Sequence, residues 1–155
     1  MGIGSIFGQT VAVTMSPSSA NRYSGQTQQF NAPVSGSANT AVTWSITPPG
    51  TGSVSASGLY TTPAAIPTAQ SVTITATSAA DPTKSASAVV SLSPLTISIS
   101  PASSNRFAGQ TQQVNATIQK STNTNVTWSI SSAGTGSISA NGLYTSQVPC
   151  LLQLW

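Results

Sequence analysis

The sequence is almost without charge. Its 155 residues include four Lys and Arg, a single acidic residue, Asp81, and no histidine. General acid–base catalysis needs paired carboxylates or a histidine, so hydrolases of the Ser-His-Asp or glycosidase kind are excluded. Calcium needs several carboxylates and structural zinc needs Cys or His, so we expect no metal and no other cofactor. The sequence therefore predicts a protein that is not an enzyme.

The few basic residues form no cluster. The net charge of +3 reflects the lack of acids rather than a basic stripe. Binding of nucleic acid depends on Lys and Arg side chains that neutralise phosphates, so a nucleic-acid partner is not expected. So little charge also gives little repulsion between strand edges. Self-association therefore remains an open alternative.

Cysteine and long apolar runs are also scarce. Cys150 is the only cysteine, so no internal disulfide can form. Residues 1–10 have no basic segment and only scattered apolar side chains. We expect them to be a flexible leader rather than a signal peptide or a membrane span. If the protein is secreted, its export signal would lie outside this sequence.

The main pattern that is present is an internal repeat. Residues 39–46 read Asn-Thr-Ala-Val-Thr-Trp-Ser-Ile and return 84 positions later, at 123–130, as Asn-Thr-Asn-Val-Thr-Trp-Ser-Ile. The same offset relates other pairs of residues: Pro17 and Pro101, Gly25 and Gly109, Gly58 and Gly142, Tyr60 and Tyr144. So long a period favours tandem domains over solenoid repeats of about 20–50 residues.

Each copy contains a tryptophan on a predicted strand. Apolar residues alternate there with Thr and Ser, which is typical of a half-buried antiparallel strand. We therefore predict a structural core that contains Val42, Trp44 and Ile46 in the first copy, and Val126, Trp128 and Ile130 in the second. A platform on which Trp44 or Trp128 stacks against a sugar is the alternative interpretation.

The first copy reads as about seven short strands separated by turns, which is the pattern of a Greek-key β-sandwich. We expect Gly58 to adopt a positive φ in a tight turn. Pro33 has no N–H to donate, so it predicts an edge, a bulge or an early strand end. The predicted strands are residues 11–15, 26–34, 39–46, 52–55, 59–61, 71–78 and 86–92.

The second copy follows the first as far as Thr145 and then departs from it. We expect one domain at 11–94 and another at 95–155 that lacks its last two strands. An incomplete sandwich exposes unpaired backbone and apolar faces. The second domain should therefore be less ordered than the first, or be completed by strand exchange between molecules. The residues expected on the exposed face are Ile118, Val126, Trp128 and Ile130.

Two tyrosines are candidates for surface contact. Tyr60 and Tyr144 each follow a Gly-Leu pair at a predicted turn, where an aromatic ring can meet a partner. Arg22 and Tyr23, with Arg106 and Phe107 in the second copy, are interpreted as parts of a solvated loop.

Five short motifs follow one another along the first copy: Ser16-Pro17, Gly25-Gln26-Thr27, Val42-Thr43-Trp44-Ser45, Ser57-Gly58-Leu59-Tyr60 and Val72-Thr73-Ile74-Thr75-Ala76. In their order and spacing they resemble the bacterial Ig-like domains of the group 2 type, found in adhesins, intimin and invasin relatives, and phage virion proteins. The resemblance covers residues 11–94 fully and 95–145 in part. It implies an Ig-like fold and a spacer or adhesion role at a cell or virion surface, with no catalytic residues to transfer.

The expected class is therefore an all-β protein of tandem immunoglobulin-like Greek-key sandwiches, located outside the cell or on a virion. Other copies of the chain or neighbouring Ig-like domains are the expected partners, with no membrane insertion. Two alternatives stay open: a self-assembling extracellular filament subunit completed by strand exchange, and a carbohydrate-binding module whose partners are surface glycans.

Overall fold

The computed structural model describes residues 9–147, and these form strands, turns and loops without a helix. The chain divides into two compact units. The first extends to Leu95 and includes Lys120–Thr122; the second consists of Thr96–Gln119 and the residues from Asn123 onward. Most of the expected leader, and the tail from 148 on with Cys150, lie outside the described residues.

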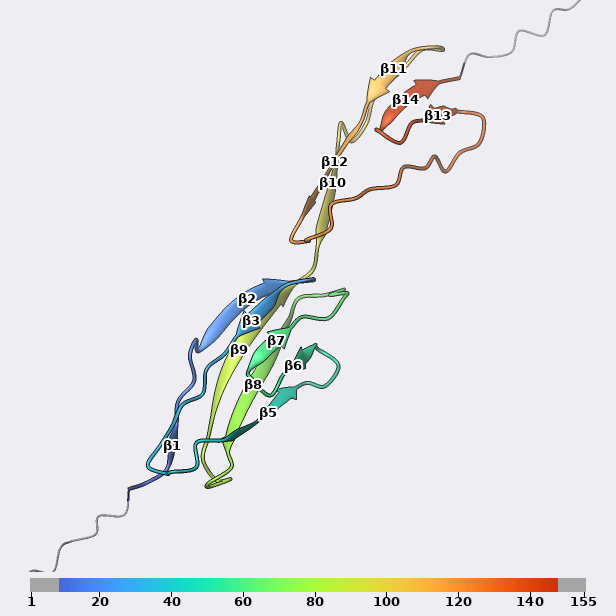
Figure 1. The fold of residues 1–155 in the computed structure, drawn as a ribbon. Helices are drawn as coiled ribbons and strands as arrows, with labels where there is room; N and C mark the ends of the chain where they lie inside the picture. Colours follow the sequence, from blue (N-terminus) through green and yellow to red (C-terminus); the bar gives the residue numbers. More distant parts are fainter. Residues whose placement is uncertain (1–8, 148–155) are drawn as a thin grey trace, which may run out of the picture. The chain divides into compact units, whose positions relative to one another are not determined.

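The first unit is a sandwich of antiparallel sheets with one parallel pairing (Figure 1). One layer has the strand order β2-β9-β8-β5, and the facing layer has the order β3-β7-β6, extended by the pair β1-β4. These are the orders of an immunoglobulin-like Greek key. The strands are β1 (Ala12–Val13), β2 (Ser19–Tyr23), β3 (Thr27–Gln29), β4 (Val34–Ser35), β5 (Val42–Thr47), β6 (Ser53–Val54), β7 (Leu59–Thr61), β8 (Gln70–Ser78) and β9 (Ser85–Ser93). The all-β Ig-like fold class is thus confirmed.

The core of the first unit lies between these layers. β8 and β9 are long strands in which branched or small apolar residues alternate with Ser and Thr, so each strand buries one face. The opposite layer contributes Phe30 and Tyr60, and the connection before β8 contributes Ile66. The buried cluster comprises Phe30, Tyr60, Ile66, Val72, Ile74, Ala88, Val90 and Leu92.

The predicted tryptophan strand forms, but it does not supply the centre of this core. Val42, Trp44 and Ile46 share the inward face of β5, as the alternation indicates, yet all three are only partly buried. The reason is that β5 is the edge strand of its sheet and has a neighbour on one side only, β8. The prediction of a buried Trp44 was therefore wrong, because the side chain is only partly buried. Trp44 and Ile46 do pack against the buried cluster.

Two further features refine the predicted strands. Arg22 and Tyr23 were expected to lie in a solvated loop, but residues 19–23 form β2, which pairs in parallel with β9. Arg22 lies in this strand, and its guanidinium donates to the Thr27 carbonyl at 3.0 Å and to the Gln28 side-chain oxygen. The predicted strand 26–34 is split into β3 and β4. Pro33 lies in the break, as its missing N–H predicts.

The second unit repeats one layer of the first. Its sheet β11-β14-β13 and its pair β10-β12 match β3-β7-β6 and β1-β4 residue for residue at the 84-residue offset. For example, Gln112 pairs with Tyr144 as Gln28 pairs with Tyr60. The strands are β10 (Thr96–Ser100), β11 (Thr111–Gln113), β12 (Asn115–Gln119), β13 (Gly136–Ile138) and β14 (Leu143–Ser146).

The other layer is absent from the described part of the second unit. Residues 103–107 and 126–131, the counterparts of β2 and β5, are not strands, and Figure 1 draws 122–135 as a loop. Their partners in the first unit are β9 and β8, whose counterparts would fall at positions 154–177. The predicted strand at 123–130 was therefore wrong, because a strand needs a neighbour to hold its backbone hydrogen bonds. Val126, Trp128 and Ile130 are partly buried.

Candidate functional site

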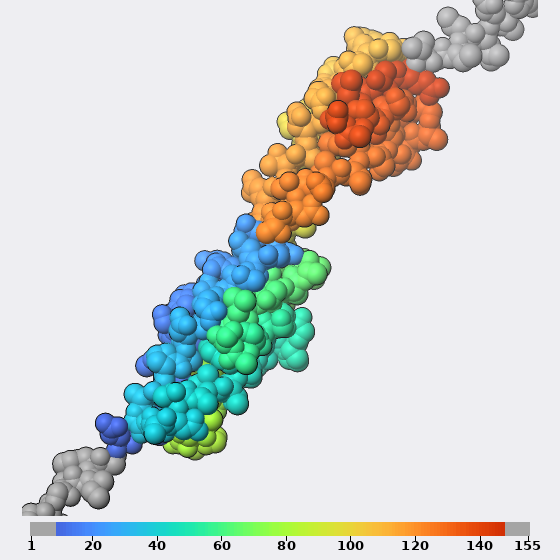
Figure 2. All heavy atoms as spheres, in the orientation of Figure 1, coloured from blue at the N-terminus to red at the C-terminus, as the bar shows by residue number. Residues whose placement is uncertain are grey.

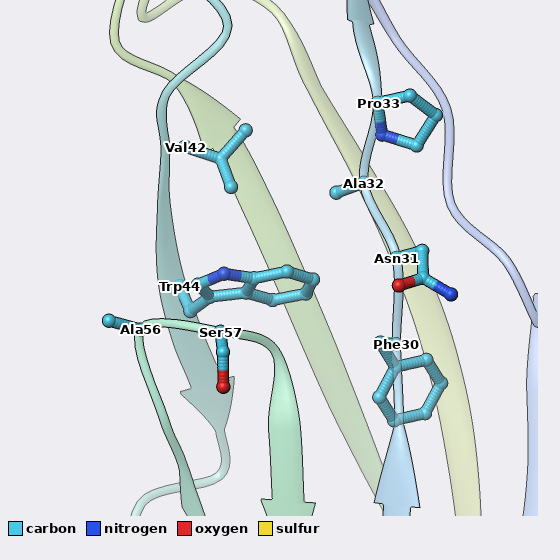
Figure 3. Close-up of a pocket in the computed structure, with 8 residues that line it drawn as sticks. All are labelled: Phe30, Asn31, Ala32, Pro33, Val42, Trp44, Ala56 and Ser57. Carbon is cyan, nitrogen blue, oxygen red and sulfur yellow. The ribbon is translucent and has the colours of Figure 1, made fainter.

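A hollow of the first unit lies beside Trp44. Figure 3 shows the indole extending from β5 towards residues 30–33, with the turn at Ala56 and Ser57 just below the ring. The hollow has a volume of about 390 Å³. It is lined by Phe30, Asn31, Ala32, Pro33, Val42, Trp44, Ala56 and Ser57.

A glycine turn holds the Trp44 ring in place. Gly58 has a φ of 83°, as the sequence predicts, and its N–H and C=O bind Ser55 and Phe30. A Cβ atom at this position would lie 2.3 Å from the Phe30 carbonyl oxygen and 2.7 Å from Cζ2 of Trp44. The turn therefore approaches the indole more closely than any other residue type permits. Gly142 is related to Trp128 in the same way in the second unit.

The hollow offers little chemistry beyond apolar contact. None of its lining residues is charged. The backbone of Asn31 exchanges hydrogen bonds with Ser16, at 2.8 and 3.0 Å, and the Ser57 hydroxyl lies 2.8 Å from that of Ser55. An indole beside an amide and a hydroxyl can contact an uncharged ligand, but it cannot move a proton. The geometry fits a structural cleft at a sheet edge.

Tyr60 is not a surface residue, and its assignment as a contact was wrong. Its side chain is fully buried, and its hydroxyl donates to the Thr51 carbonyl at 2.6 Å. Burial raises the pKa of this phenol to about 12. The turn before it does face solvent, but Tyr60 is on the inward face of β7.

Tyr144 makes the same bond in a more open setting. Its hydroxyl donates to the Thr135 carbonyl at 2.5 Å, and its ring is partly buried. The hydrogen bond fixes the ring against its own unit, so the structure supplies no observation that makes it a contact residue. Among the described aromatic side chains only Phe107 is exposed, at 82%. A planar aromatic platform for sugars is therefore not visible between residues 9 and 147.

The sole carboxylate has a local role. Asp81 accepts hydrogen bonds from the backbone N–H and the hydroxyl of Thr83, at 3.0 and 2.7 Å. These bonds lower the pKa of Asp81 and stabilise the turn between β8 and β9. Residues 9–147 contain no group of three or more His, Cys, Asp or Glu that could hold a metal ion. In the same range no helix has the length and apolar character needed to cross a membrane.

The second unit has its own hollow beside Trp128, with a volume of about 220 Å³. Ile97 and Ile99 of β10 line it and are 58% and 52% exposed. The sequence indicated an open face here but placed only Ile118, Val126, Trp128 and Ile130 on it. The alternation Thr96-Ile97-Ser98-Ile99 was the signal that could have added the two isoleucines. The hollow is lined by Ile97, Ile99, Ala116, Val126, Thr127, Trp128 and Ser129.

No protein-family model matches the chain. No curated protein matches it either. The assignment of a function therefore depends on the fold and on the two faces described above.

Proposed function

We propose that this chain is a non-enzymatic structural module, built from Ig-like units, of a protein at a cell or virion surface, where it serves as a spacer or adhesive element. The observation that carries the proposal is the repeat itself. Two copies of one unit share strand registers at a fixed offset, whereas the sequence contains one carboxylate and no histidine. Repetition of a fold without a chemical site favours a mechanical or spacing role over catalysis.

The composition of the surface supports this role. Outward positions of β8 and β9 are mostly Ser and Thr, and the charged side chains are few. Such a surface leaves little electrostatic steering towards a small charged ligand. Contacts with neighbouring Ig-like domains or other copies would then depend on backbone edges and apolar faces.

An adhesion assay with folded units tests the proposal. Beads coated with the full chain should bind cells or other coated beads, and unlabelled chain should compete for that binding. Beads carrying an unfolded variant, Ile74→Asp, provide the control for non-specific attachment. Equal attachment by both, or turnover of any substrate in a hydrolase screen, would contradict the proposal.

A glycan array separates the carbohydrate-binding alternative. On our proposal no glycan binds saturably, because Trp44 is half-buried and Tyr60 is fully buried. Saturable binding that is lost in a folded Trp44→Leu variant would replace the structural role with a sugar-binding one.

A further inference from the structure

We propose that the first unit binds a second copy of this chain through the free edge of β5, so that the two β5 strands pair antiparallel about a two-fold axis. We define the open edge as the backbone N–H and C=O groups of Val42, Trp44 and Ile46. Such pairing deepens the proposed structural role, on which it rests, because it names the partner and the edge that meets it.

The hydrogen bonds of β5 show which of its residues face this edge. The Ala79 N–H donates to the Ala41 carbonyl at 2.9 Å, so these two residues form a hydrogen-bonded pair at the start of the β5–β8 ladder. Such pairs alternate along an antiparallel ladder, so the odd-numbered residues of β5 bind β8. The N–H and C=O groups of Val42, Trp44 and Ile46 therefore point away from β8. Within residues 9–147 no second strand pairs with β5.

β5 is the longest edge strand that the structure describes in the first unit. It has six residues, whereas the strands of the facing layer have two or three. β2, at the opposite edge of the same layer, has five residues but carries Arg22. Short edges and charged side chains are the usual protection against pairing between sheet edges, and β5 has neither. Figure 2 shows teal spheres, the colour of β5 in Figure 1, on the visible surface of the first unit.

The sequence of the open edge is self-complementary. Residues 42–46 read Val-Thr-Trp-Ser-Ile, with a β-branched residue at each end, a hydroxyl residue next to it and Trp at the centre. When two copies pair antiparallel about Trp44, Val42 of one copy opposes Ile46 of the other, and the two Trp44 residues oppose each other. All three pairs have outward N–H and C=O groups on both sides, and each pair exchanges two hydrogen bonds. The interface is therefore closed and has six backbone hydrogen bonds.

The side chains of the paired strands also fit one another. On the outer face the exposed Thr43 opposes Ser45 of the other copy. The first unit already contains such a pair, because the hydroxyls of Thr75 and Ser87, which are opposite each other on β8 and β9, lie 2.8 Å apart. On the inner face the two indoles are neighbours, and the hollow beside Trp44 leaves space for apolar side chains of the second copy. Aromatic and Thr–Ser pairs of this kind stabilise antiparallel ladders.

A second copy fits this edge better than a charged partner does. Residues 39–47 contain no charged side chain, and the whole chain has a net charge of only +3. Repulsion between copies is therefore weak, and nothing at the edge selects a charged strand. The symmetry of residues 42–46 is satisfied by the same segment of another molecule. The motif recurs at 126–130, where the structure has no strand, and this second occurrence provides a control.

The mass of the chain and its hydrogen exchange at increasing concentration test the pairing. Sedimentation equilibrium between about 1 µM and 1 mM should show a monomer that is replaced by a dimer and by nothing larger. Over the same range, exchange of the Val42, Trp44 and Ile46 amides should slow by at least about tenfold. The amides of the alternate residues of β5 already bind β8 and should exchange slowly at every concentration.

Paired charges on the exposed face of β5 locate the interface and its register. Thr43→Lys with Ser45→Lys places lysines directly opposite each other in the dimer, which should weaken it by at least about tenfold. Thr43→Asp with Ser45→Lys places opposite charges there and should restore the dimer. Thr127→Lys with Ser129→Lys adds the same charge to the second unit and should leave the dimer unchanged. Exchange of the β8 and β9 amides reports whether each variant retains its fold.

The proposal is overturned by a chain that stays monomeric up to about 1 mM, by a dimer whose outward β5 amides stay unprotected, or by lysine pairs that weaken the dimer equally in the two units. Failure of the Asp and Lys variant to dimerise would overturn the two-fold register. The adhesion assay is separate from these outcomes. A monomer whose coated beads still attach to cells would contradict the pairing and leave the structural role in place.

Discussion

The two units share the first part of one fold, over residues 11–61 and 95–145, and reach different degrees of burial. Phe30 and Tyr60 are fully buried in the first unit, whereas the counterparts Val114 and Tyr144 are partly buried in the second. The difference is the presence of β8 and β9 in the first unit. The local sequence is enough to form the layer that both units share, which is β3-β7-β6 in the first unit. Side chains of that layer become fully buried only where the layer that contains β8 and β9 packs against it.

Polar side chains repeat between the units as faithfully as the strands do. Gln29 and Gln113 each donate through Nε2 to the turn before β7 or β14, at 2.7 and 2.8 Å. Thr62 and Ser146 each donate through a hydroxyl to carbonyl oxygens of the turn before β3 or β11. These bonds join residues 28 to 39 positions apart within the shared layer, so they do not need a second layer. They explain why the second unit keeps its registers.

The largest effect should come from truncating a side chain of β8, a strand that has no counterpart among the described residues of the second unit. Ile74 of β8 is fully buried, so Ile74→Ala should lower the unfolding free energy of the first unit by about 2–5 kcal/mol. Hydrogen exchange of β7 to β9 measures the loss, and β11 and β14 should not change. Ser71→Ala, at an exposed position of the same strand, is the matched control and should cost less than about 0.5 kcal/mol. Equal losses in both units would mean that they do not fold separately.

Trp44 and its counterpart Trp128 allow the stability of the two units to be compared with the same substitution. Trp44 packs against the buried cluster, so Trp44→Ala should cost the first unit about 3 kcal/mol, the low end for a buried Trp. Trp128 has no β8 counterpart beside it among the described residues, so Trp128→Ala should cost about 1 kcal/mol. Urea denaturation followed separately for each unit gives both values. Similar costs would show that the second unit has a core that we have overlooked.

These expectations also show which parts of the fold were accessible from sequence. Alternation and turn residues predicted β5, β7, β8 and β9, the turn at Gly58 and the break at Pro33, because each depends on residues close in the chain. The strand at 19–23 was missed because a polar segment becomes a strand only when β9 lies beside it. The burial of Tyr60 and the partial exposure of Trp44 depend on which strand is at the edge of a sheet, which no local pattern contains.

The third prediction concerns the pH dependence of the first unit. Burial raises the pKa of Tyr60 from 10.0 to about 12, so the folded state keeps this proton where the unfolded chain loses it. The unfolding free energy should therefore be unaffected below pH 10 and fall by about 2–3 kcal/mol between pH 10 and 12. Tyr60→Phe should lose about 1 kcal/mol at neutral pH, with the bond to Thr51, but it should lack this additional fall. A parallel decline in both proteins would assign the alkaline sensitivity to other groups.

The smallest effect is expected at Pro33. Here the pairing of β1 with β4 in the first unit differs from the pairing of their counterparts, β10 and β12, in the second. The Thr14 N–H donates to the Pro33 carbonyl at 3.2 Å, but proline has no N–H with which to return a hydrogen bond. In the second unit the corresponding residues are Ser98 and Thr117, and β10 and β12 pair through them without a break. Pro33→Thr should add one backbone hydrogen bond worth about 1 kcal/mol and lose a similar amount by freeing the unfolded chain. The net change in unfolding free energy should be within about 0.5 kcal/mol, because the two contributions oppose each other. Nuclear magnetic resonance should nevertheless detect a new protected amide at position 33, which extends β4 towards Asn31 as in its counterpart β12. A fully exchanging amide there would mean that the break in the first unit has a cause other than the proline.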